Sequence, residues 1–354
     1  MQLLDKTIKK IIPADSAMRH QARTRLEQLA MPHWALGRIM DLAEDLAAMT
    51  GSLHPPVARK TVATMAGDHG VTAQGVSKYP QAVTVQMVHN FICGGAAINA
   101  LARQVGARVV VVDMGVAGDL TDLAAAGRIL SRRIGPGTKD MTTGPAMSRE
   151  EAVRCIEAGI SVSLELAETT DLFATGDMGI GNTTPSSAIV AVFSGVSVAE
   201  VSGRGTGIEE EQLLHKVRMI ELALRINRPD PSDALDVLAK IGGFEIGGIA
   251  GLILGAASLK RPVLIDGFIS TAGALIAAHL APTARDYMIA SHRSMEQGHR
   301  IALSHLGKKP LLDLDMRLGE GTGAVLAMNL VEAAVRILTE TATFEEAAVS
   351  RATP

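Results

Sequence analysis

Aromatic residues are scarce in this chain of 354 residues, where phenylalanine, tryptophan and tyrosine together make up 3%. Trp34 is the only tryptophan, and Tyr79 and Tyr287 are the only tyrosines. Proteins that bind single-stranded nucleic acid need aromatic platforms for the bases and a basic surface for the phosphates. The formal net charge of −3 offers no such surface. Nucleic acid is therefore not an expected partner.

Cysteine and long hydrophobic runs are almost absent too. Cys93 and Cys155 can form neither a disulfide framework nor a zinc-binding set, and so low a cysteine content is typical of a reducing cytoplasm. The most apolar stretch, residues 246–258, is shorter than the ~20 residues that cross a bilayer, so no membrane is expected either. Residues 1–13 lack the apolar core of a signal peptide. These absences together predict a soluble, cytoplasmic protein.

Small aliphatic residues carry the packing instead. Hydrophobic residues account for 47% of the chain and charged residues for 20%, so a large core can be buried. Such side chains suit helices laid closely on a parallel sheet. Residues 107–114 hold four consecutive valines without alternation, as in a central parallel strand that is buried on both faces. Similar strands, each followed by a small-residue loop and a helix, predict a wound α/β domain; they are expected at 61–66, 171–174, 261–266 and 287–290.

Apolar periodicity and capping residues predict the helices. A capping box at Ser148 begins a helix that is expected to last to Leu166. Two more helices, at 17–30 and 34–49, precede the α/β core, and their apolar faces should pack on another part of the molecule or on a partner. The remaining helices are expected at 83–104, 208–226, 234–258 (with interruptions at Gly242-Gly243 and Gly247-Gly248) and 324–338.

Glu320 stands on a turn with a glycine on each side. Residues 312–318 alternate apolar with charged side chains, which predicts an extended segment leading into Gly319, Glu320 and Gly321. Glycine tolerates positive φ and close approach, so a ligand could press against this turn and Glu320 could act as a general base. From these residues alone, a cap for the following helix explains Glu320 equally well.

A second glycine-rich segment, residues 176–184, is expected to begin a helix. Free backbone amides at the positive end of a helix dipole suit a phosphate. The Lys-Ser/Thr ending of the nucleotide P-loop is missing, so chemistry on ATP or GTP is not indicated. The alternative to a phosphate site is that these glycines serve only the tight packing of a strand on a helix.

Three other patterns are weaker. The glycines around Glu320 fit the form Gly-x-Gly-x-x-Ala of dinucleotide sites, but no strand and no acidic ribose reader follow them. His292, Glu296 and His299 could share one helix face, yet nothing in the sequence completes a metal shell, so no metal is expected. Asp68-His69 follows a strand and could be a ligand, a base or part of a turn.

Eight blocks occur in order along the chain: GDHGV at 67–71, GVSKYP at 75–80, GGAAIN at 94–99, GDMGIGNTTP at 176–185, GRGTG at 203–207, DGFISTAGA at 266–274, SHRS at 291–294 and RLGEGTGA at 317–324. Together they resemble the nicotinate-nucleotide–dimethylbenzimidazole phosphoribosyltransferases, the family that makes the lower nucleotide of cobalamin. The resemblance extends over nearly the whole chain.

This resemblance implies a Rossmann-like parallel sheet flanked by helices, with a smaller helical domain built from both chain ends. It also implies a homodimer and no cofactor. Residues 1–58 would supply the N-terminal helices of the small domain or a dimer contact, and residues 59–305 the α/β core. Residues 306–354 would carry the loop of Glu320 and a helix that returns to the small domain.

By the same resemblance, the protein transfers the 5-phosphoribosyl group from nicotinate mononucleotide to 5,6-dimethylbenzimidazole or a related base. The products would be α-ribazole 5′-phosphate and nicotinate. Glu320 would be the catalytic base, with Asp177 and Lys216 as further catalytic residues near the donor. The family often carries glutamate where this chain has Asp177, so the carboxylate here would reach less far by one methylene.

The substrate-binding residues are implied by the same blocks. The donor phosphate is expected on the backbone of residues 179–184, and the aromatic base between Glu320 and residues 77–86. The full implied set is Ser77, Tyr79, Gln86, Met87, Gly179, Gly181, Asn182, Thr183, Thr184, Gly205, Ser291, Ser294, Leu318, Gly319 and Gly321.

One carboxylate suffices for this chemistry. Nicotinate leaves with a neutral ring nitrogen, so no general acid is needed, in contrast to the hydrolysis of O-glycosides. The attacking benzimidazole must lose the proton on its other ring nitrogen, and Glu320 could accept it. The alternative is a binding protein instead of an enzyme. Such a protein would bind a phosphorylated ligand without catalysis, and Glu320 would only cap a helix.

Overall fold

The strands form where apolar residues follow one another without alternation, because helices cover both faces of the sheet. The computed structural model describes residues 2–205 and 207–350. Its strands are β1 (Lys60–Gly67), β2 (Arg108–Gly115), β3 (Leu130–Ser131), β4 (Leu172–Met178), β5 (Val263–Ile265) and β6 (Met288–Ala290). All six lie in one sheet with the order β3-β2-β1-β4-β5-β6, and every neighbouring pair is parallel. The predicted wound α/β fold is confirmed.

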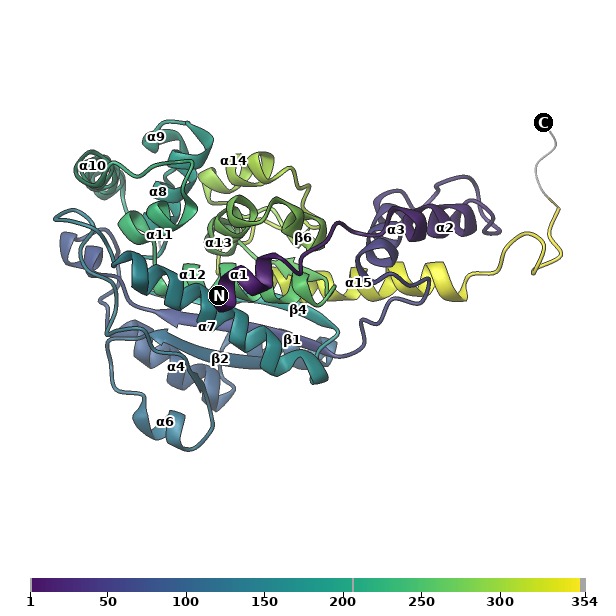
Figure 1. Cartoon of the computed structure of the whole chain (residues 1–354), viewed down its shortest axis with the longest axis horizontal. Coiled ribbons are helices and arrows are strands. Elements are labelled where there is room, and N and C mark those ends of the chain that lie inside the picture. The colour runs from purple at the N-terminus through teal and green to yellow at the C-terminus, as the bar shows by residue number, and fades with distance from the viewer. Residues whose placement is uncertain (1, 206, 351–354) are drawn as a thin grey trace.

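Helices pack on both faces of this sheet (Figure 1). On one face, α12 (Phe244–Ser258) contacts β1, β2 and β4, and both α7 (Arg149–Leu166) and α13 (Phe268–Leu280) pack against α12. The other face carries three helices, which contact strands from β2 to β5: α4 (Val83–Cys93), α5 (Ala97–Val105) and α15 (Thr322–Glu340). The core therefore consists of three layers with the sheet in the middle.

The helix α12 runs unbroken through Gly247-Gly248, where the sequence predicted an interruption. A Cβ at Gly159 of α7 would lie 2.0 Å from the carbonyl oxygen of Gly248, and one at Gly251 would lie 1.9 Å from that of Ile156. These glycines thus serve the close packing of two helices and do not end either of them. The interruption predicted at Gly242-Gly243 is confirmed, since α11 (Ala234–Ile241) ends just before it.

Other boundaries also differ from the sequence prediction: the helix expected at 17–30 ends at Leu26, and the helix expected at 34–49 begins at Arg38. The single helix expected at 83–104 is divided into α4 and α5, because Gly94 takes the left-handed conformation with φ 77° and ends α4. The strand expected at 171–174 continues to Met178, because Gly176 and Asp177 pair with Thr64 and Met65 of β1. Asp177 is therefore the penultimate residue of a strand and not part of a loop.

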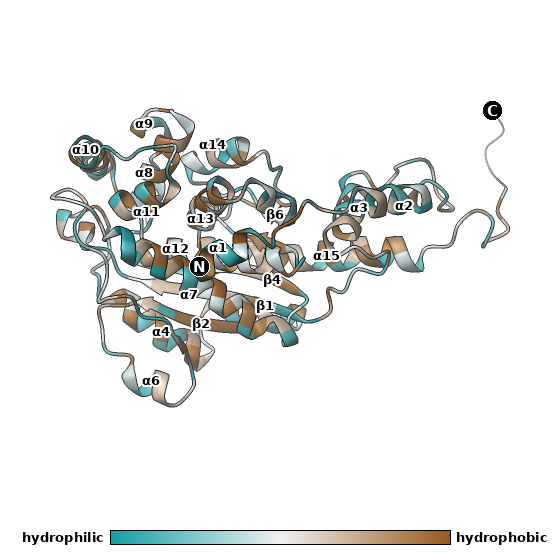
Figure 2. Ribbon diagram, in the orientation of Figure 1, coloured by the Kyte–Doolittle hydropathy of each residue, from teal (hydrophilic) through white to brown (hydrophobic). Residues whose placement is uncertain are grey.

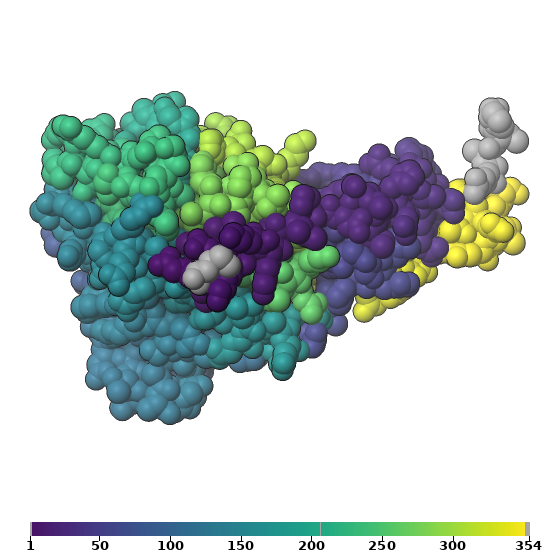
Figure 3. All heavy atoms as spheres, in the orientation of Figure 1, coloured from purple at the N-terminus to yellow at the C-terminus, as the bar shows by residue number. Residues whose placement is uncertain are grey.

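The helices α2 (Ser16–Leu26), α3 (Arg38–Thr50) and the end of α15, which come from near the two ends of the chain, form a lobe that projects from the α/β body (Figures 1 and 3). Asp15 caps α2 by accepting from the Met18 amide. Both α2 and α3 pack against α15. In contrast, α1 (Leu3–Ile8) packs on α7 and α12 of the body. The apolar faces near the N-terminus are thus covered by distant parts of the same chain.

Among the described residues, α15 is the one helix long and apolar enough to cross a membrane by length and composition alone. Half of its apolar stretch is buried, and the helix packs on β4, β5, α3 and α5. Figure 2 shows hydrophobic residues concentrated in the central strands and on inward helix faces. Packing within the protein therefore accounts for the composition of α15. The remaining helices are α6 (Thr121–Ala125), α8 (Thr183–Ser194), α9 (Val198–Val201), α10 (Glu210–Asn227) and α14 (Gln297–Leu306), with 3-10 turns at Gly70–Gln74, Ala167–Thr169 and Pro282–Tyr287.

Candidate active site

A cavity of about 270 Å³ lies at the carboxyl ends of the strands. The strand order reverses between β1 and β4, and open α/β sheets bind their ligands at such a reversal. Segments that follow β1, β4, β5 and β6 line the cavity, together with the residues just before α15. The lining residues are Val76, Ser77, Tyr79, Asp177, Gly179, Gly181, Asn182, Thr183, Arg204, Gly205, Gly267, Phe268, Ile269, His292, Ser294, Glu296, Arg317, Leu318 and Gly319.

The segment between β4 and α8 offers a helix N-terminus to the cavity. No side chain caps the first turn of α8, because Asn182 at the N-cap position donates from Nδ2 to Asp177 Oδ2 at 3.0 Å. Gly181 has φ 87°, and a Cβ there would lie 2.7 Å from Thr72, so this turn requires glycine. The positive end of the α8 dipole therefore faces the cavity, as an anion site of this kind requires.

Lys216 of α10 stands directly behind this segment. Its side chain is fully buried, and Nζ donates to Thr183 Oγ1 at 2.8 Å and to the Gly203 carbonyl at 3.1 Å. Burial lowers the pKa of Lys216 to about 8, and nearby Glu296 opposes that effect. Lys216 does not itself line the cavity. Its charge reaches the cavity through Thr183, which does.

Asp177 lies at the floor of the cavity. Its Oδ1 atom is buried and has no hydrogen-bond partner among the described residues. Burial raises the pKa of Asp177 well above its ordinary value, and the neighbouring Asp266 and Glu320 carboxylates add to the shift. Asp177 therefore keeps its proton to a higher pH than a surface aspartate does.

The turn around Glu320 is made of three consecutive residues with positive φ. The angles are 85° at Gly319, 63° at Glu320 and 100° at Gly321. Glycine adopts this conformation freely, whereas a residue with a Cβ there costs on the order of 1–3 kcal/mol. A Cβ at Gly176 would lie 2.4 Å from the Glu320 carbonyl, so β4 must also carry a glycine where the turn crosses it. The surrounding structure thus holds Glu320 in a strained conformation.

The Glu320 carboxylate points to α5 and not to the helix that follows it. Its Oε2 accepts from the Ile98 amide at 3.2 Å, in the first turn of α5. Burial raises the pKa of Glu320, the Ile98 hydrogen bond opposes this, and the Asp266 charge adds to it. The alternative that Glu320 caps the next helix is wrong, because the N-cap residue of α15 is Gly321 and no side chain of the described residues caps that helix from the N-cap position.

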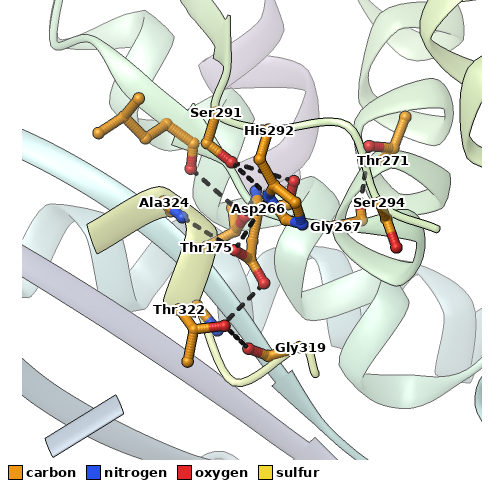
Figure 4. Close-up of polar contacts among 12 residues, drawn as sticks. Thr175, Asp266, Gly267, Thr271, Ser291, His292, Ser294, Gly319, Thr322 and Ala324 are labelled. Atoms are coloured by element: carbon orange, nitrogen blue, oxygen red, sulfur yellow. Dashed lines mark hydrogen bonds and ion pairs between the residues drawn. The ribbon is translucent and has the colours of Figure 1, made fainter. Parts of the chain in front are cut away.

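A polar cluster at the ends of β5 and β6 adjoins the turn (Figure 4). Asp266 accepts from the Gly321 and Ala324 amides, at 3.2 and 2.9 Å. Ser291 donates its hydroxyl proton to the Asp266 carbonyl at 3.1 Å. His292 Nδ1 lies 3.8 Å from Asp266 Oδ1. Ser291 is therefore engaged within the cluster, whereas Ser294 and His292 line the cavity.

The three residues weighed as a metal set serve separate contacts. His299 accepts at Nδ1 from the Ser294 amide at 2.9 Å, so its Nε2 carries the proton and donates to Thr271 at 2.9 Å. Burial lowers the pKa of His299 to about 3, which keeps the ring neutral. Across residues 2–205 and 207–350, no three His, Cys, Asp or Glu side chains are grouped to hold a metal ion. His299 is thus a buried imidazole that fixes the backbone of Ser294.

The predicted acceptor residues divide into two groups. Ser77 and Tyr79 line the cavity, and the Tyr79 side chain is exposed. Gln86 and Met87 lie on α4 and do not line it. Their part in binding the aromatic base stays a prediction.

Several residues that the family resemblance implied lie near the cavity without lining it. Other residues line the cavity although the resemblance did not imply them. Lys216, Thr184, Ser291, Glu320 and Gly321 belong to the first group. The sequence reasoning missed Val76, Arg204, Gly267, Phe268, Ile269 and Arg317, and it weighed His292 and Glu296 only as possible metal ligands. An arginine inside a glycine cluster, as at Arg204 and Arg317, was the signal that could have identified two of them. Thr206, in the cluster at 203–207, lies outside the described residues.

Comparisons with known proteins agree along the length of the chain. A family model described as Phosphoribosyltransferase matches residues 11–349. A nicotinate-nucleotide–dimethylbenzimidazole phosphoribosyltransferase from Syntrophotalea carbinolica is 64% identical over 351 residues, which are 99% of each chain. One of the same name from Desulfotalea psychrophila is 55% identical over the same share. The crystal structure of CobT from Thermus thermophilus superposes with a TM-score of 0.91 and 48% identity, and covers 95% of this chain and 100% of that one.

Proposed function

This chain belongs to the family of nicotinate-nucleotide–dimethylbenzimidazole phosphoribosyltransferases, and on that premise we propose how it works. It transfers the 5-phosphoribosyl group of nicotinate mononucleotide to 5,6-dimethylbenzimidazole or a related base, and Glu320 is the general base. One observation carries the proposal. A single cavity joins the helix N-terminus after β4 to Gly319, next to Glu320.

The donor phosphate binds at the N-terminus of α8. The amides of Ile180, Asn182 and Thr184 already donate within the protein, so Gly179, Gly181 and Thr183, which line the cavity, are the backbone donors proposed for the phosphate. Lys216 adds a positive charge one side chain away, through Thr183. Arg204 and Ser294 line the same cavity and supply further donors. A dianionic phosphate is thereby met by charge and by hydrogen-bond donors without a metal ion.

The reaction is a single displacement with inversion at the anomeric carbon. Nicotinate departs with a neutral ring nitrogen, which makes a general acid unnecessary. The attacking nitrogen of the benzimidazole becomes positive, and Glu320 removes the proton from the other ring nitrogen. Burial keeps Glu320 a stronger base than a surface glutamate, because it raises the pKa of the carboxyl group. Asp177 lines the cavity near the expected position of nicotinate mononucleotide, and burial favours its protonated form by raising its pKa.

The base binds where apolar surface and the Glu320 turn come together. Tyr79 and Leu318 line the cavity and leave 51% and 58% of their surface exposed, which offers flat apolar area to an aromatic ring. Ser77 lies beside Tyr79, and Gln86 and Met87 of α4 complete the acceptor side. The two glycines of the turn, Gly319 and Gly321, allow the ring to lie directly against the backbone.

We further propose that the protein is a cytoplasmic homodimer, as its resemblance to this family implies. The domain division at 1–58, 59–305 and 306–354 accompanies this proposal, and the packing of α2 and α3 on α15 supports it. The exception is α1, which packs on the α/β body. Light scattering over a hundredfold range of concentration, expected to give twice the chain mass throughout, tests the dimer.

The decisive experiment mixes the protein with nicotinate mononucleotide and dimethylbenzimidazole and measures free nicotinate. Wild-type protein should release it only when the base is present, whereas a non-catalytic binding protein would release none. Glu320→Gln should lower kcat by roughly 100-fold or more, the usual effect of losing a general base, and should leave donor binding unchanged. Glu340→Gln, an exposed change at the other end of α15, is the matched control. Near-normal turnover by Glu320→Gln would refute the role of this residue.

A further inference from the structure

The helix that follows Glu320 is capped from another strand. Its N-cap residue, Gly321, has no side chain that could accept from the free amides of the first turn. Asp266, directly after β5, fills this role: Oδ2 accepts from the Gly321 amide at 3.2 Å and Oδ1 from the Ala324 amide at 2.9 Å. Figure 4 shows Asp266 between Ala324, Thr322 and His292. The end of β5 and the start of α15 are thus joined by two hydrogen bonds to one carboxylate.

Asp266 is itself held on three sides. Its amide donates to Thr175 Oγ1 of β4 at 3.1 Å, and its carbonyl accepts from the Ser291 hydroxyl at 3.1 Å. The His292 ring lies beside it, and a Cβ at Gly323 would come within 2.0 Å of His292 Nδ1. The carboxylate is fully buried. Its position is therefore fixed by β4, by β6 and by α15 together.

A second anchor holds the turn from the opposite side. Thr64 of β1, whose side chain is fully buried, donates its hydroxyl proton to the Glu320 carbonyl at 3.2 Å. Asp266 therefore holds the amide of Gly321, and Thr64 holds the carbonyl of Glu320. These two groups belong to the same peptide unit. Fixing both ends of that unit fixes the direction in which the Glu320 side chain leaves the backbone.

We propose that Asp266 is a positioning residue for the reaction, which together with Thr64 holds the Glu320 peptide in its strained conformation and so aims the Glu320 carboxylate at the acceptor. This inference rests on the proposed function of Glu320 as the base. Asp266 does not line the cavity, so it acts through the turn and not on the substrates. A left-handed glutamate would otherwise relax, because that conformation is unfavourable for a residue with a Cβ.

The charge of Asp266 has a second effect on the base. The carboxyl groups near Glu320 are Asp266 at the end of β5 and Asp177 at the end of β4, with His292 on the far side of Asp266. Asp266 raises the pKa of Glu320, in addition to the larger effect of burial. Removing the Asp266 charge should therefore lower the pKa of Glu320. A change that only destabilised the fold would not alter this pKa.

The test compares Asp266→Asn with wild-type protein in steady-state kinetics over a range of pH. The amide keeps the shape of the carboxylate but turns an NH2 group toward the amide of Gly321 or of Ala324. One of the two hydrogen bonds that Asp266 accepts from the start of α15 is therefore lost. We expect kcat to fall on the order of 10- to 100-fold, the effect of a small misplacement of a catalytic group, while KM for nicotinate mononucleotide changes less than about threefold. The acid limb of the kcat profile should move to lower pH.

Two other variants complete the experiment. Asp233→Asn is the matched control, because Asp233 also accepts from two amides in the first turn of a helix, α11, away from the cavity. It should lower stability without changing kcat or the acid limb. Thr64→Val removes only the second anchor and suits a buried strand, so it tests the same idea if Asp266→Asn fails to fold. We expect it to lower kcat by about 10-fold with KM unchanged.

Four outcomes decide the proposal. A kcat within twofold of wild type in Asp266→Asn overturns it, as does a loss of kcat with an unmoved acid limb. If Asp266→Asn does not fold, a normal kcat in Thr64→Val overturns it. A fall in kcat with a shifted limb supports it. Glu320→Gln, measured in parallel, separates the two levels: if that variant retains turnover, the base assignment has failed, whereas an inactive Glu320→Gln with a normal Asp266→Asn refutes the positioning role alone.

Discussion

Lys216 carries a buried charge whose energetic cost can be measured directly. Its side chain is fully buried, and desolvation lowers its pKa from the ordinary value of 10.5 to about 8. At 1.36 kcal/mol for each pH unit, that difference means that the charged form costs the folded state about 3 kcal/mol. Replacing Lys216 by methionine removes the charge and keeps most of the apolar volume. The same substitution leaves the Gly203 carbonyl without its donor, a loss of about 1–3 kcal/mol.

The sign of the pH dependence follows from the two pKa values. Below pH 8 the lysine is protonated in both the folded and the unfolded state, and the full penalty applies. Between pH 8 and 10.5 the folded state has released its proton while the unfolded chain still binds one, so the stability of the wild type gains as the pH rises. Lys216→Met lacks this titration. Its free energy of unfolding relative to wild type should therefore fall by about 2–3 kcal/mol between pH 7 and pH 10.

Urea unfolding of both proteins at several pH values measures this difference. The contributions of the other titrating groups to the free energy of unfolding are the same in both proteins and cancel. Lys240→Met is the matched control, because Lys240 is partly exposed and pairs with Asp236. If the stability difference between Lys216→Met and wild type stays constant over this pH range, Lys216 is not a desolvated cation. In kinetics, the lost charge should raise KM for nicotinate mononucleotide, because Lys216 holds a positive charge behind Thr183, which lines the cavity. An unchanged KM would remove Lys216 from the phosphate site.

Two further predictions concern the base and the acceptor. Because burial raises the pKa of Glu320 and the base must be ionised, kcat should decline with falling pH below a midpoint that lies above the ordinary value of 4.5; a profile flat down to pH 4.5 would contradict this. Tyr79→Ala and Gln86→Ala should raise KM for dimethylbenzimidazole and leave KM for the nucleotide unchanged, since both belong to the acceptor side. Leu164→Ala, a change at an exposed apolar residue of α7, is the control, and an unchanged acceptor KM in both variants would argue against this pocket.

The order of strands and helices could be predicted from the sequence because local patterns determine it. Four consecutive valines in β2 and the capping box at Ser148 each specify an element within a few residues. Glycine, in contrast, has several uses that a sequence does not distinguish. Gly94 ends a helix with a left-handed residue, whereas Gly247 and Gly251 sit inside α12 and allow α7 to approach, and Gly248 makes room for Met114 of β2. Only the partner in space decides which use applies.

The same limit applies to the site. Glu320 could be singled out because two glycines mark its turn. Asp266 could not be assigned its role from sequence, because the amides that it accepts from lie more than fifty residues further along the chain. Likewise, the segment at 312–318 alternates like a strand, yet among the described residues it forms only a single bridge, between Leu312 and His292. A pattern of alternation describes the local conformation and does not say which neighbour is available for pairing.

The helix α15 runs from the candidate active site to the lobe that contains α2 and α3. It begins at Thr322, directly after the Glu320 turn, and ends at Glu340, where Arg25 of α2 donates to the carbonyl of Leu338 at 2.8 Å. Its 19 residues span about 28 Å, and its packing on β4 and β5 keeps this rod in place. Because Asp266 fixes the first turn of the rod and the lobe holds its last turn, the direction of the Glu320 carboxylate depends on contacts at both ends. The lobe, although it lies far from the cavity, therefore supports the helix that follows the Glu320 turn.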